Sequence, residues 1–276
     1  MQCNRSKFYD PQHIVRDVTA KLDEVQRSGA SVDYLTFVPD GEPTLDLNLG
    51  EAIAGVKKLG IPVALISNSS LMDQPNLREE LMRLDWISLK IDSVREATWR
   101  RLDRPHKHID FSSMLEGIAR FSEDFTGKLT TETMLIADYN DSEEEIEETG
   151  QFLERIEPQI SYISIPTRPP AERQAVPADE AVLAKAYSTF AARVAHVEHL
   201  IGYEGDEFGF SGDAYQDLLS ITAVHPMRRE AVLQLLAKDK ADYQVVEQLI
   251  QEGRIISTEY QGHTYLVRKF REKQMG

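Results

Sequence analysis

A short turn in the first quarter of the chain carries the residues best suited to bind a charged ligand. It reads Phe37-Val38-Pro39-Asp40-Gly41-Glu42-Pro43-Thr44-Leu45. Gly41 lets the backbone approach a ligand closely, Pro43 fixes the turn, and the Glu42 carboxylate beside exposed carbonyl groups can receive an ammonium group. A tight turn whose Thr44 or Asp46 caps the next helix explains the same residues without a ligand. Both interpretations remain open at this point.

A second candidate group lies on a segment with polar side chains at alternate positions. In Trp86-Ile87-Ser88-Leu89-Lys90-Ile91-Asp92, the period of two sends Ser88, Lys90 and Asp92 to one face of a strand. If helices cover the other face of a parallel sheet, this face must line a site or a curved interior, because burial of an isolated charge is costly. A Lys90–Asp92 pair that serves only the structure is the alternative.

Other polar residues are weaker candidates. Arg104-Pro105-His106-Lys107-His108 clusters four cations, and Arg168 precedes Pro169-Pro170, so either segment could clamp a carboxylate or a phosphate, or form a solvated loop. The spacing of the histidines at 196, 199, 225 and 263 fits no standard metal motif. Cys3 is the only cysteine, which excludes an internal disulfide framework and a multi-cysteine metal site made by this chain alone.

These residues must be positioned by a repeated strand and helix pattern. Apolar runs predict strands at 32–38, 62–66, 86–91, 129–136 and 161–165, with a last run at 197–203. Amphipathic stretches predict helices near 10–28, 46–59, 76–83, 112–125, 143–156 and 178–194. Asn140-Asp141-Ser142 before three glutamates predicts a capped helix start. The fold class is therefore α/β with a parallel sheet, doubly wound or curved towards a barrel, and both put ligands at the carboxyl ends of the strands.

The pattern changes after Gly212. Two short helical faces, at 231–236 and 243–250, precede a predicted hairpin formed by 255–260 and 264–267. Helix, helix, hairpin is a winged-helix-like order. We therefore predict two domains, a larger one at 1–212 and a winged-helix-like α+β domain at 213–276.

The composition fits a folded protein with an uneven charge. Of 276 residues, 41% are hydrophobic and 28% are charged, which suits a globular core. The net charge is −15, but residues 226–276 hold 9 Lys and Arg against 7 Asp and Glu, so the rest of the chain carries −17. An acidic body argues against avid, sequence-indifferent nucleic-acid binding. No membrane-length apolar run and no signal peptide is visible, so we expect a cytoplasmic protein without a membrane partner.

Taken together, the motifs resemble those of the radical S-adenosylmethionine (radical SAM) proteins, with the iron–sulfur oxidoreductase branch similar to tRNA wyosine-forming enzymes as the nearest match. The resemblance runs from Cys3 to about residue 204, and the tail resembles a domain appended in some members. The motifs that carry it, in chain order, are Asp33-Tyr34-Leu35-Thr36-Phe37, Gly41-Glu42-Pro43-Thr44-Leu45, Ile66-Ser67-Asn68-Ser69, Arg104-Pro105-His106-Lys107, Asn140-Asp141-Ser142 and Arg168-Pro169-Pro170-Ala171-Glu172.

The resemblance implies a fold, two cofactors and a set of site residues. The fold is a partial (β/α)6 TIM-like barrel. A 4Fe-4S cluster on a CxxxCxxC loop reduces S-adenosylmethionine (SAM) to a 5′-deoxyadenosyl radical, which abstracts a substrate hydrogen. By position, the turn Gly41, Glu42, Pro43 and Thr44 would bind SAM at its ammonium, Ser67 and Asn68 would border its carboxylate and ribose, and Asp92, Asn140 and Arg168 would line the rest.

The same resemblance suggests a catalytic residue and partners. Lys90 could form a Schiff base with a carbonyl substrate. The substrate itself is unidentified, with a modified tRNA base as one candidate. An electron donor such as flavodoxin or ferredoxin would be a partner of the cluster.

The chain also departs from the family motif. The motif has three cysteines, and thiolates are the cluster ligands, yet only Cys3 is present, at the position of the third. Two explanations stay open: the first strand and two cysteines lie upstream of Met1, or the protein is a degenerate pseudoenzyme that binds a ligand or partner without radical chemistry. A further hypothesis makes the tail a nucleic-acid module, with phosphates facing Arg228, Arg229, Lys238, Lys240 and Arg254.

Overall fold

The computed structural model divides into two units. It describes residues 4–27, 31–38, 41–169, 175–200, 208, 211–224, 226–260 and 262–269. The N-terminal unit comprises Met1–Ile165 and Val176–Ile201, and the C-terminal unit comprises Pro166–Ala175 and Gly202–Gly276. The loop after the fifth strand is thus grouped with the C-terminal unit, which the sequence did not indicate. The predicted domain boundary at residue 212 stays a prediction.

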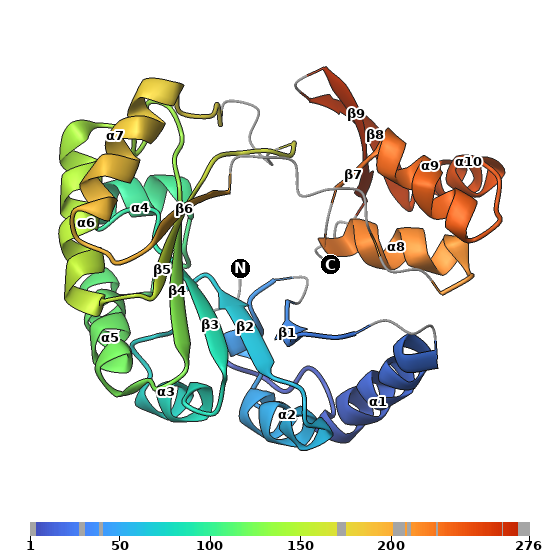
Figure 1. The fold of residues 1–276 in the computed structure, drawn as a ribbon, viewed down its shortest axis with the longest axis horizontal. Coiled ribbons are helices and arrows are strands. Elements are labelled where there is room, and N and C mark those ends of the chain that lie inside the picture. Colours follow the sequence, from blue (N-terminus) through green and yellow to red (C-terminus); the bar gives the residue numbers. More distant parts are fainter. Residues whose placement is uncertain are drawn as a thin grey trace. The chain divides into compact units, whose positions relative to one another are not determined.

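A six-stranded parallel sheet forms the centre of the N-terminal unit (Figure 1). Its strands follow the chain order without a switch: β1 (Leu35–Phe37), β2 (Val63–Ser67), β3 (Trp86–Lys90), β4 (Lys128–Met134), β5 (Ile160–Ser164) and β6 (Val197–Leu200). A doubly wound sheet reverses its strand order at a switch point, whereas a barrel does not. The order therefore decides between the two predicted architectures in favour of the partial barrel.

Helices line the outer side of this sheet (Figure 1). They are α1 (Pro11–Arg27), α2 (Leu49–Val56), α3 (Pro75–Leu81), α4 (Glu96–Leu102), α5 (Phe111–Asp124), α6 (Glu143–Ile156) and α7 (Glu180–Ala191), with short 3₁₀ turns η1 (Pro43–Leu45) and η2 (Lys57–Leu59). Strand residues such as Leu65, Leu89 and Ile163 are fully buried in the core beneath the helices. On the other face of the sheet, Lys90 and Glu132 are only partly buried.

Capping side chains explain where two predicted helices begin. Ser142 accepts a hydrogen bond from the Glu145 amide at 3.2 Å at the start of α6. Asp110 accepts one from the Ser113 amide at 2.7 Å at the start of α5. Both caps satisfy an otherwise unpaired backbone N–H of the first turn. The predicted start of the 143–156 helix is confirmed.

Two elements of this unit differ from the prediction. Strand β1 covers three residues instead of seven, since its pairing with β2 runs only from Leu35 to Phe37. Helix α4 was not predicted, because it is only seven residues long and buries Trp99 alone, which gives too short a pattern for a helical period. Trp99 packs on Phe111 with ring centroids 5.0 Å apart, which ties α4 to α5.

The C-terminal unit has the predicted winged-helix-like order. Its elements are α8 (Ala214–Val224), β7 (Met227–Arg228), α9 (Arg229–Lys238), α10 (Gln244–Gln251), β8 (Ile255–Tyr260) and β9 (His263–Arg268). The three strands form an antiparallel sheet in the order β7-β9-β8, which confirms the predicted hairpin. Helix α8 was not predicted, yet it buries Leu218 in a core shared with Met227, Val232 and Leu249.

None of the helices in the described ranges combines the length and the apolar character that a bilayer crossing requires.

Candidate functional site

The Glu42 carboxylate ties the turn after β1 to the end of β2. Its Oε1 accepts hydrogen bonds from the Thr44 amide (3.1 Å), the Thr44 hydroxyl (2.7 Å) and the Ser67 hydroxyl (2.8 Å). Its Oε2 accepts one from the Asn68 amide at 2.7 Å. Four neutral donors thus orient one carboxylate at the carboxyl ends of two adjacent strands, where ligands bind in such folds.

The charge of Glu42 has no counter-charge within the described part of the chain. No lysine or arginine there forms an ion pair with it. Burial raises the pKa of Glu42 above its usual value, and the hydrogen bonds from Thr44, Asn68 and Ser67 only partly offset this. A carboxylate in this state would gain stability from a cationic ligand. Gly41, next to it, has a φ of +146°, and a Cβ added there would meet no atom within 4 Å, so the backbone beside the carboxylate is open.

The loop after β2 connects this turn to β3. The Ser67 hydroxyl accepts a hydrogen bond from the Ser69 amide at 3.0 Å, and the Ser69 hydroxyl donates one to the Lys90 carbonyl at 3.1 Å. The Asn68 side-chain oxygen accepts from the Ser70 amide at 3.0 Å, while the rest of the exposed Asn68 side chain is left for solvent or a ligand. The structure therefore brings the predicted residues Glu42, Ser67 and Asn68 together. Ser69 links their loop to β3 through its hydrogen bond to the Lys90 carbonyl.

An ion cluster occupies the end of β3. Lys90 Nζ lies 2.6 Å from Asp92 Oδ2 and 3.4 Å from Asp103 Oδ1. The Asp92 side chain is only 2% exposed, and its Oδ1 accepts a hydrogen bond from the Met134 amide at 2.9 Å. The predicted Lys90–Asp92 pair thus exists. Asp103, which follows α4, completes it; no local pattern in the sequence pointed to this residue.

The pKa values of this cluster limit its chemistry. Burial alone would lower the pKa of Lys90, but the charges of Asp92 and Asp103 outweigh it and raise that pKa, so the ammonium stays protonated at neutral pH. Burial, together with the charge of Asp92, raises the pKa of Asp103 to about 7, against the opposing effect of Lys90. A Schiff base requires a neutral amine. The catalytic role of Lys90 stays a prediction, and its pairing with two carboxyl groups works against it.

A row of polar side chains crosses the sheet at the level of Lys90. Strand register places Lys90 opposite Glu132, Glu132 opposite Tyr162, and Tyr162 opposite Glu198. The Ser164 hydroxyl donates a hydrogen bond to Glu132 at 2.7 Å. The period-two argument therefore holds beyond β3, because β4, β5 and β6 also direct polar groups to the face that the helices leave open.

Asn140 takes a structural position. Its side-chain nitrogen donates to the carbonyls of Asp92 (2.7 Å) and Met134 (2.8 Å), and its oxygen accepts from the Ile136 amide at 2.9 Å. The side chain is 2% exposed. Asn140 thus closes the turn after β4 and holds the end of β3; its predicted contact with a ligand stays a prediction.

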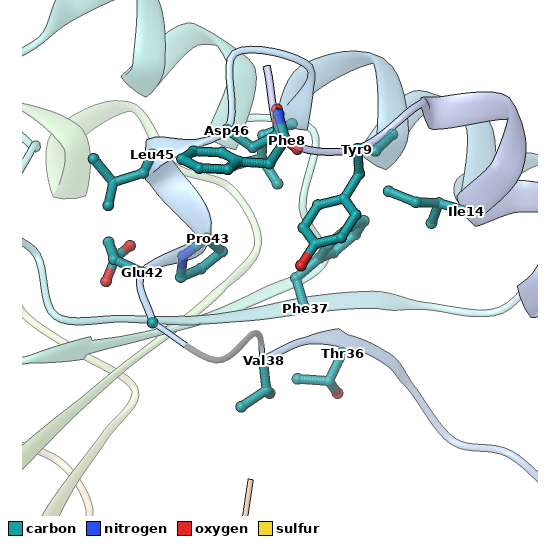
Figure 2. Close-up of a pocket in the computed structure, with 13 residues that line it drawn as sticks. Phe8, Tyr9, Ile14, Thr36, Phe37, Val38, Glu42, Pro43, Leu45 and Asp46 are labelled. Atoms are coloured by element: carbon teal, nitrogen blue, oxygen red, sulfur yellow. The ribbon is translucent and has the colours of Figure 1, made fainter. Parts of the chain in front are cut away.

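A pocket of about 480 Å³ lies beside the Glu42 turn. Figure 2 shows the aromatic rings of Phe8, Tyr9 and Phe37 gathered near Pro43, with Ile14 and Glu42 at opposite ends. Most of its lining is apolar, and Glu42 and Asp46 supply carboxyl groups. Asp46 accepts hydrogen bonds from the Phe8 and Asn48 amides.

The structure does not connect the remaining predicted residues to this site. Arg168 is partly buried and belongs to the C-terminal unit. Cys3, Pro39 and Asp40 fall outside the described residues. In the Arg104–His108 loop, the rings of His106 and His108 meet edge to face at 4.8 Å, and Lys107 and His108 are exposed, as the solvated-loop alternative predicted.

The residues that could hold a metal ion are the next question for this site. Within the ranges that the structure covers, no group of three or more His, Cys, Asp and Glu side chains could hold a metal ion. Iron–sulfur clusters are bound by cysteine thiolates, and the sequence has one cysteine. The residues of this chain therefore do not fit a 4Fe-4S cluster by themselves.

Comparisons with known proteins agree with the fold. Residues 2–153 match the radical SAM superfamily. A UPF0026 protein of Methanocaldococcus jannaschii is 35% identical over 271 residues, which span 98% of this chain and 84% of that protein. Two solved structures share the fold with a TM-score of 0.54 each: TYW1 with a lysine-pyruvate adduct bound (17% identity, 70% of this chain and 66% of that one) and a radical SAM methyltransferase from Sphaerobacter thermophilus (14%, 71% and 59%). The match over more than half of the sequence shows that the chain belongs to the radical SAM superfamily.

Proposed function

We propose that this protein binds SAM at the carboxyl end of its parallel sheet, with the Glu42 carboxylate receiving the ligand's ammonium group. The observation that carries the proposal is a partly buried carboxylate that is held by four neutral donors and has no cation among the described residues. A charge-assisted hydrogen bond from an ammonium would compensate the cost of burying this charge.

The surroundings of Glu42 also suit this ligand. SAM combines an ammonium and a sulfonium with an adenine ring. The open backbone at Gly41 allows a close approach, and the adjoining pocket offers aromatic and aliphatic surface next to the carboxylate. Membership of the radical SAM superfamily implies SAM and a 4Fe-4S cluster as the family's cofactors. We assign the first to this site.

The second cofactor, the 4Fe-4S cluster, is bound by cysteine thiolates. With one cysteine, the chain does not supply the thiolates of the cluster, so formation of the 5′-deoxyadenosyl radical stays a prediction. Ligand binding without radical chemistry is the function that these residues support by themselves. A tRNA substrate and a flavodoxin or ferredoxin as electron donor stay predictions as well.

Calorimetric titration of SAM into the purified chain tests the proposal. Loss of the charge-assisted contact in Glu42→Gln should weaken binding about tenfold or more, since each tenfold corresponds to roughly 1.4 kcal/mol. Glu51→Gln, at an exposed glutamate of the neighbouring α2, is the matched control and should bind like the wild type. Absence of SAM binding, or equal binding by Glu42→Gln and the wild type, would overturn the proposal.

Anaerobic incubation with iron and sulfide separates binding from radical chemistry. Because this chain carries a single thiol, we expect no cluster absorbance in the visible range and no 5′-deoxyadenosine. Formation of both would show that the protein generates the radical and would replace the binding-only conclusion.

The Schiff-base prediction for Lys90 has its own test. The fold neighbour TYW1 was solved with a lysine-pyruvate adduct, so pyruvate with borohydride is a suitable trapping reagent. The raised pKa of Lys90 predicts that trapping at this residue, located by mass spectrometry, is absent at neutral pH. Rapid labelling of Lys90 at neutral pH would support the catalytic role.

A further inference from the structure

One residue of the loop after β2 combines an unusual backbone conformation with complete burial. Ser69 has a φ of +65°, in the left-handed region that non-glycine residues rarely adopt, and its exposed fraction is 0%. The other described non-glycine residues with a positive φ are exposed: Arg104, Asp138, Glu157 and Lys240. A strained residue of this kind persists only where its surroundings hold it, and such residues cluster at functional sites.

Both donor groups of Ser69 form hydrogen bonds, each to the end of a different strand. The hydroxyl donates to the Lys90 carbonyl at the end of β3 (3.1 Å), and the amide donates to the Ser67 oxygen at the end of β2 (3.0 Å). A serine hydroxyl has one proton and accepts through its oxygen. Because the Ser67 oxygen accepts from Ser69, its own proton is available for the Glu42 carboxylate, which it reaches at 2.8 Å.

Packing behind the loop keeps this turn in place. The Ser69 carbonyl accepts a hydrogen bond from the Met72 amide at 3.1 Å, which closes the turn. The Met72 carbonyl accepts one from Arg78 Nη1 at 2.6 Å. It also lies against Gly117 of α5, where an added Cβ would come within 2.0 Å of the carbonyl oxygen. The turn that carries Ser69 is therefore held on its helix side as well as at the strand ends.

A glycine at position 69 would satisfy the backbone alone. Left-handed residues are most often glycine, because a Cβ is disfavoured in this conformation. The Ser69 hydroxyl adds an anchor to β3 that a glycine lacks. This anchor acts on Ser67, since the Ser69 amide must stay in place for the Ser67 oxygen to accept from it and donate to Glu42.

We infer that Ser69 is a positioning residue for Glu42: by binding the Lys90 carbonyl and the Ser67 oxygen, it holds the Ser67 hydroxyl in the orientation that donates to the Glu42 carboxylate. This role deepens the proposed function and rests on it. It connects the carboxylate to β3 through the Lys90 backbone, so the charge of the Lys90 side chain is not required.

NMR titration of the ligand-free full chain tests the effect on Glu42. The carboxyl carbon of Glu42, assigned by comparison with Glu42→Gln, reports the pKa of this group. In Ser69→Ala and Ser69→Gly that pKa should rise further, because the Ser67 hydrogen bond that lowers it is no longer held. Ser188→Ala is the matched control, since the Ser188 hydroxyl also donates to a backbone carbonyl, that of Ala184 on α7, at 2.9 Å. An unchanged pKa of Glu42 in both Ser69 variants would overturn the inference.

The two substitutions separate the hydroxyl from the backbone turn. Both remove the hydrogen bond to Lys90, but glycine adopts the left-handed conformation without strain, so Ser69→Gly remains informative if Ser69→Ala folds poorly. A role of the hydroxyl predicts that each variant binds SAM about threefold more weakly in calorimetry. Wild-type affinity in Ser69→Gly would show that the position requires only the turn, which would also overturn the inference.

A double-mutant cycle tests whether Ser69 acts through Ser67. Ser67→Ala should weaken SAM binding by about fivefold, and adding Ser69→Ala should change the affinity no further, because coupled residues are not additive. A loss of about fifteenfold in the double variant would mean that the two serines act independently. That result would overturn the positioning role and leave the proposed function intact. If the wild type does not bind SAM, the proposed function fails, whereas a raised pKa of Glu42 in the Ser69 variants would still support the positioning role.

Discussion

The hydroxyl of Ser67 donates a hydrogen bond to the carboxylate of Glu42 at 2.8 Å, across 25 residues of sequence. Since Ser67 ends β2 and Glu42 follows β1, this contact joins the tips of two adjacent parallel strands. The Asn68 amide reinforces it on the other carboxylate oxygen. The two motifs therefore form one hydrogen-bonded element rather than two independent loops.

Ser67→Ala should weaken SAM binding by about fivefold, because a hydrogen bond to a charged group typically contributes about 1 kcal/mol or more. Loss of the Ser67 hydroxyl also removes one of the hydrogen bonds that lower the pKa of Glu42. Ser70→Ala is the control, because Ser70 supports the same loop through its backbone amide, which the substitution keeps. Calorimetry at fixed pH measures both, and an equal affinity of the two variants would contradict the coupling.

The affinity for SAM should rise with pH. Burial raises the pKa of Glu42 above its usual value of 4.5. At a pH between the usual and the raised pKa, the Glu42 carboxyl group of the free protein holds a proton, which a cationic ligand must displace. Binding in this window should release protons, measurable by titration in buffers of different ionisation enthalpy. Glu42→Gln should abolish the release. Proton uptake when SAM binds would contradict this prediction.

Lys90→Met should destabilise the protein by about 3 kcal/mol, the lower range for a buried ion pair that loses one partner. It leaves Asp92 and Asp103 without their cation. Lys90→Arg keeps the charge and should cost less than half as much. Urea unfolding with a shared slope measures both, and similar stability of the Met variant and the wild type would show that the pair does not support the fold.

Asp103 should make stability fall as pH rises from about 4 to about 7. Its pKa is raised to about 7 in the folded protein, first by burial and then by Asp92, so the folded state holds a proton that the unfolded chain has released. Asp103→Asn should remove this component of the slope. Asp23→Asn, at an exposed carboxylate of α1, is the control. If the pH dependence of stability is unchanged in Asp103→Asn, a group other than Asp103 is responsible for it.

Much of the N-terminal unit could be predicted because its signals are local. Period two in β3 placed Lys90 and Asp92 on one face, and a serine before three glutamates marked the start of α6. Non-local partners left no such signal. Asp103 follows a helix with a single buried residue, and the carbonyls of Pro166 and Thr167 are bound by tyrosines 94 and 98 residues away. The contacts of Asn140 could not be predicted either, because nothing in the local sequence indicated that its side-chain amide forms hydrogen bonds with backbone groups.

The most direct measurement compares two adenosine ligands on the wild type and on Glu42→Gln. S-adenosylhomocysteine carries the ammonium and carboxylate groups that 5′-methylthioadenosine lacks. If Glu42 receives the ammonium, the wild type should prefer S-adenosylhomocysteine by about tenfold or more, and Glu42→Gln should lose that preference. An equal preference in both proteins, or none in the wild type, would contradict the assignment of this carboxylate to the ligand.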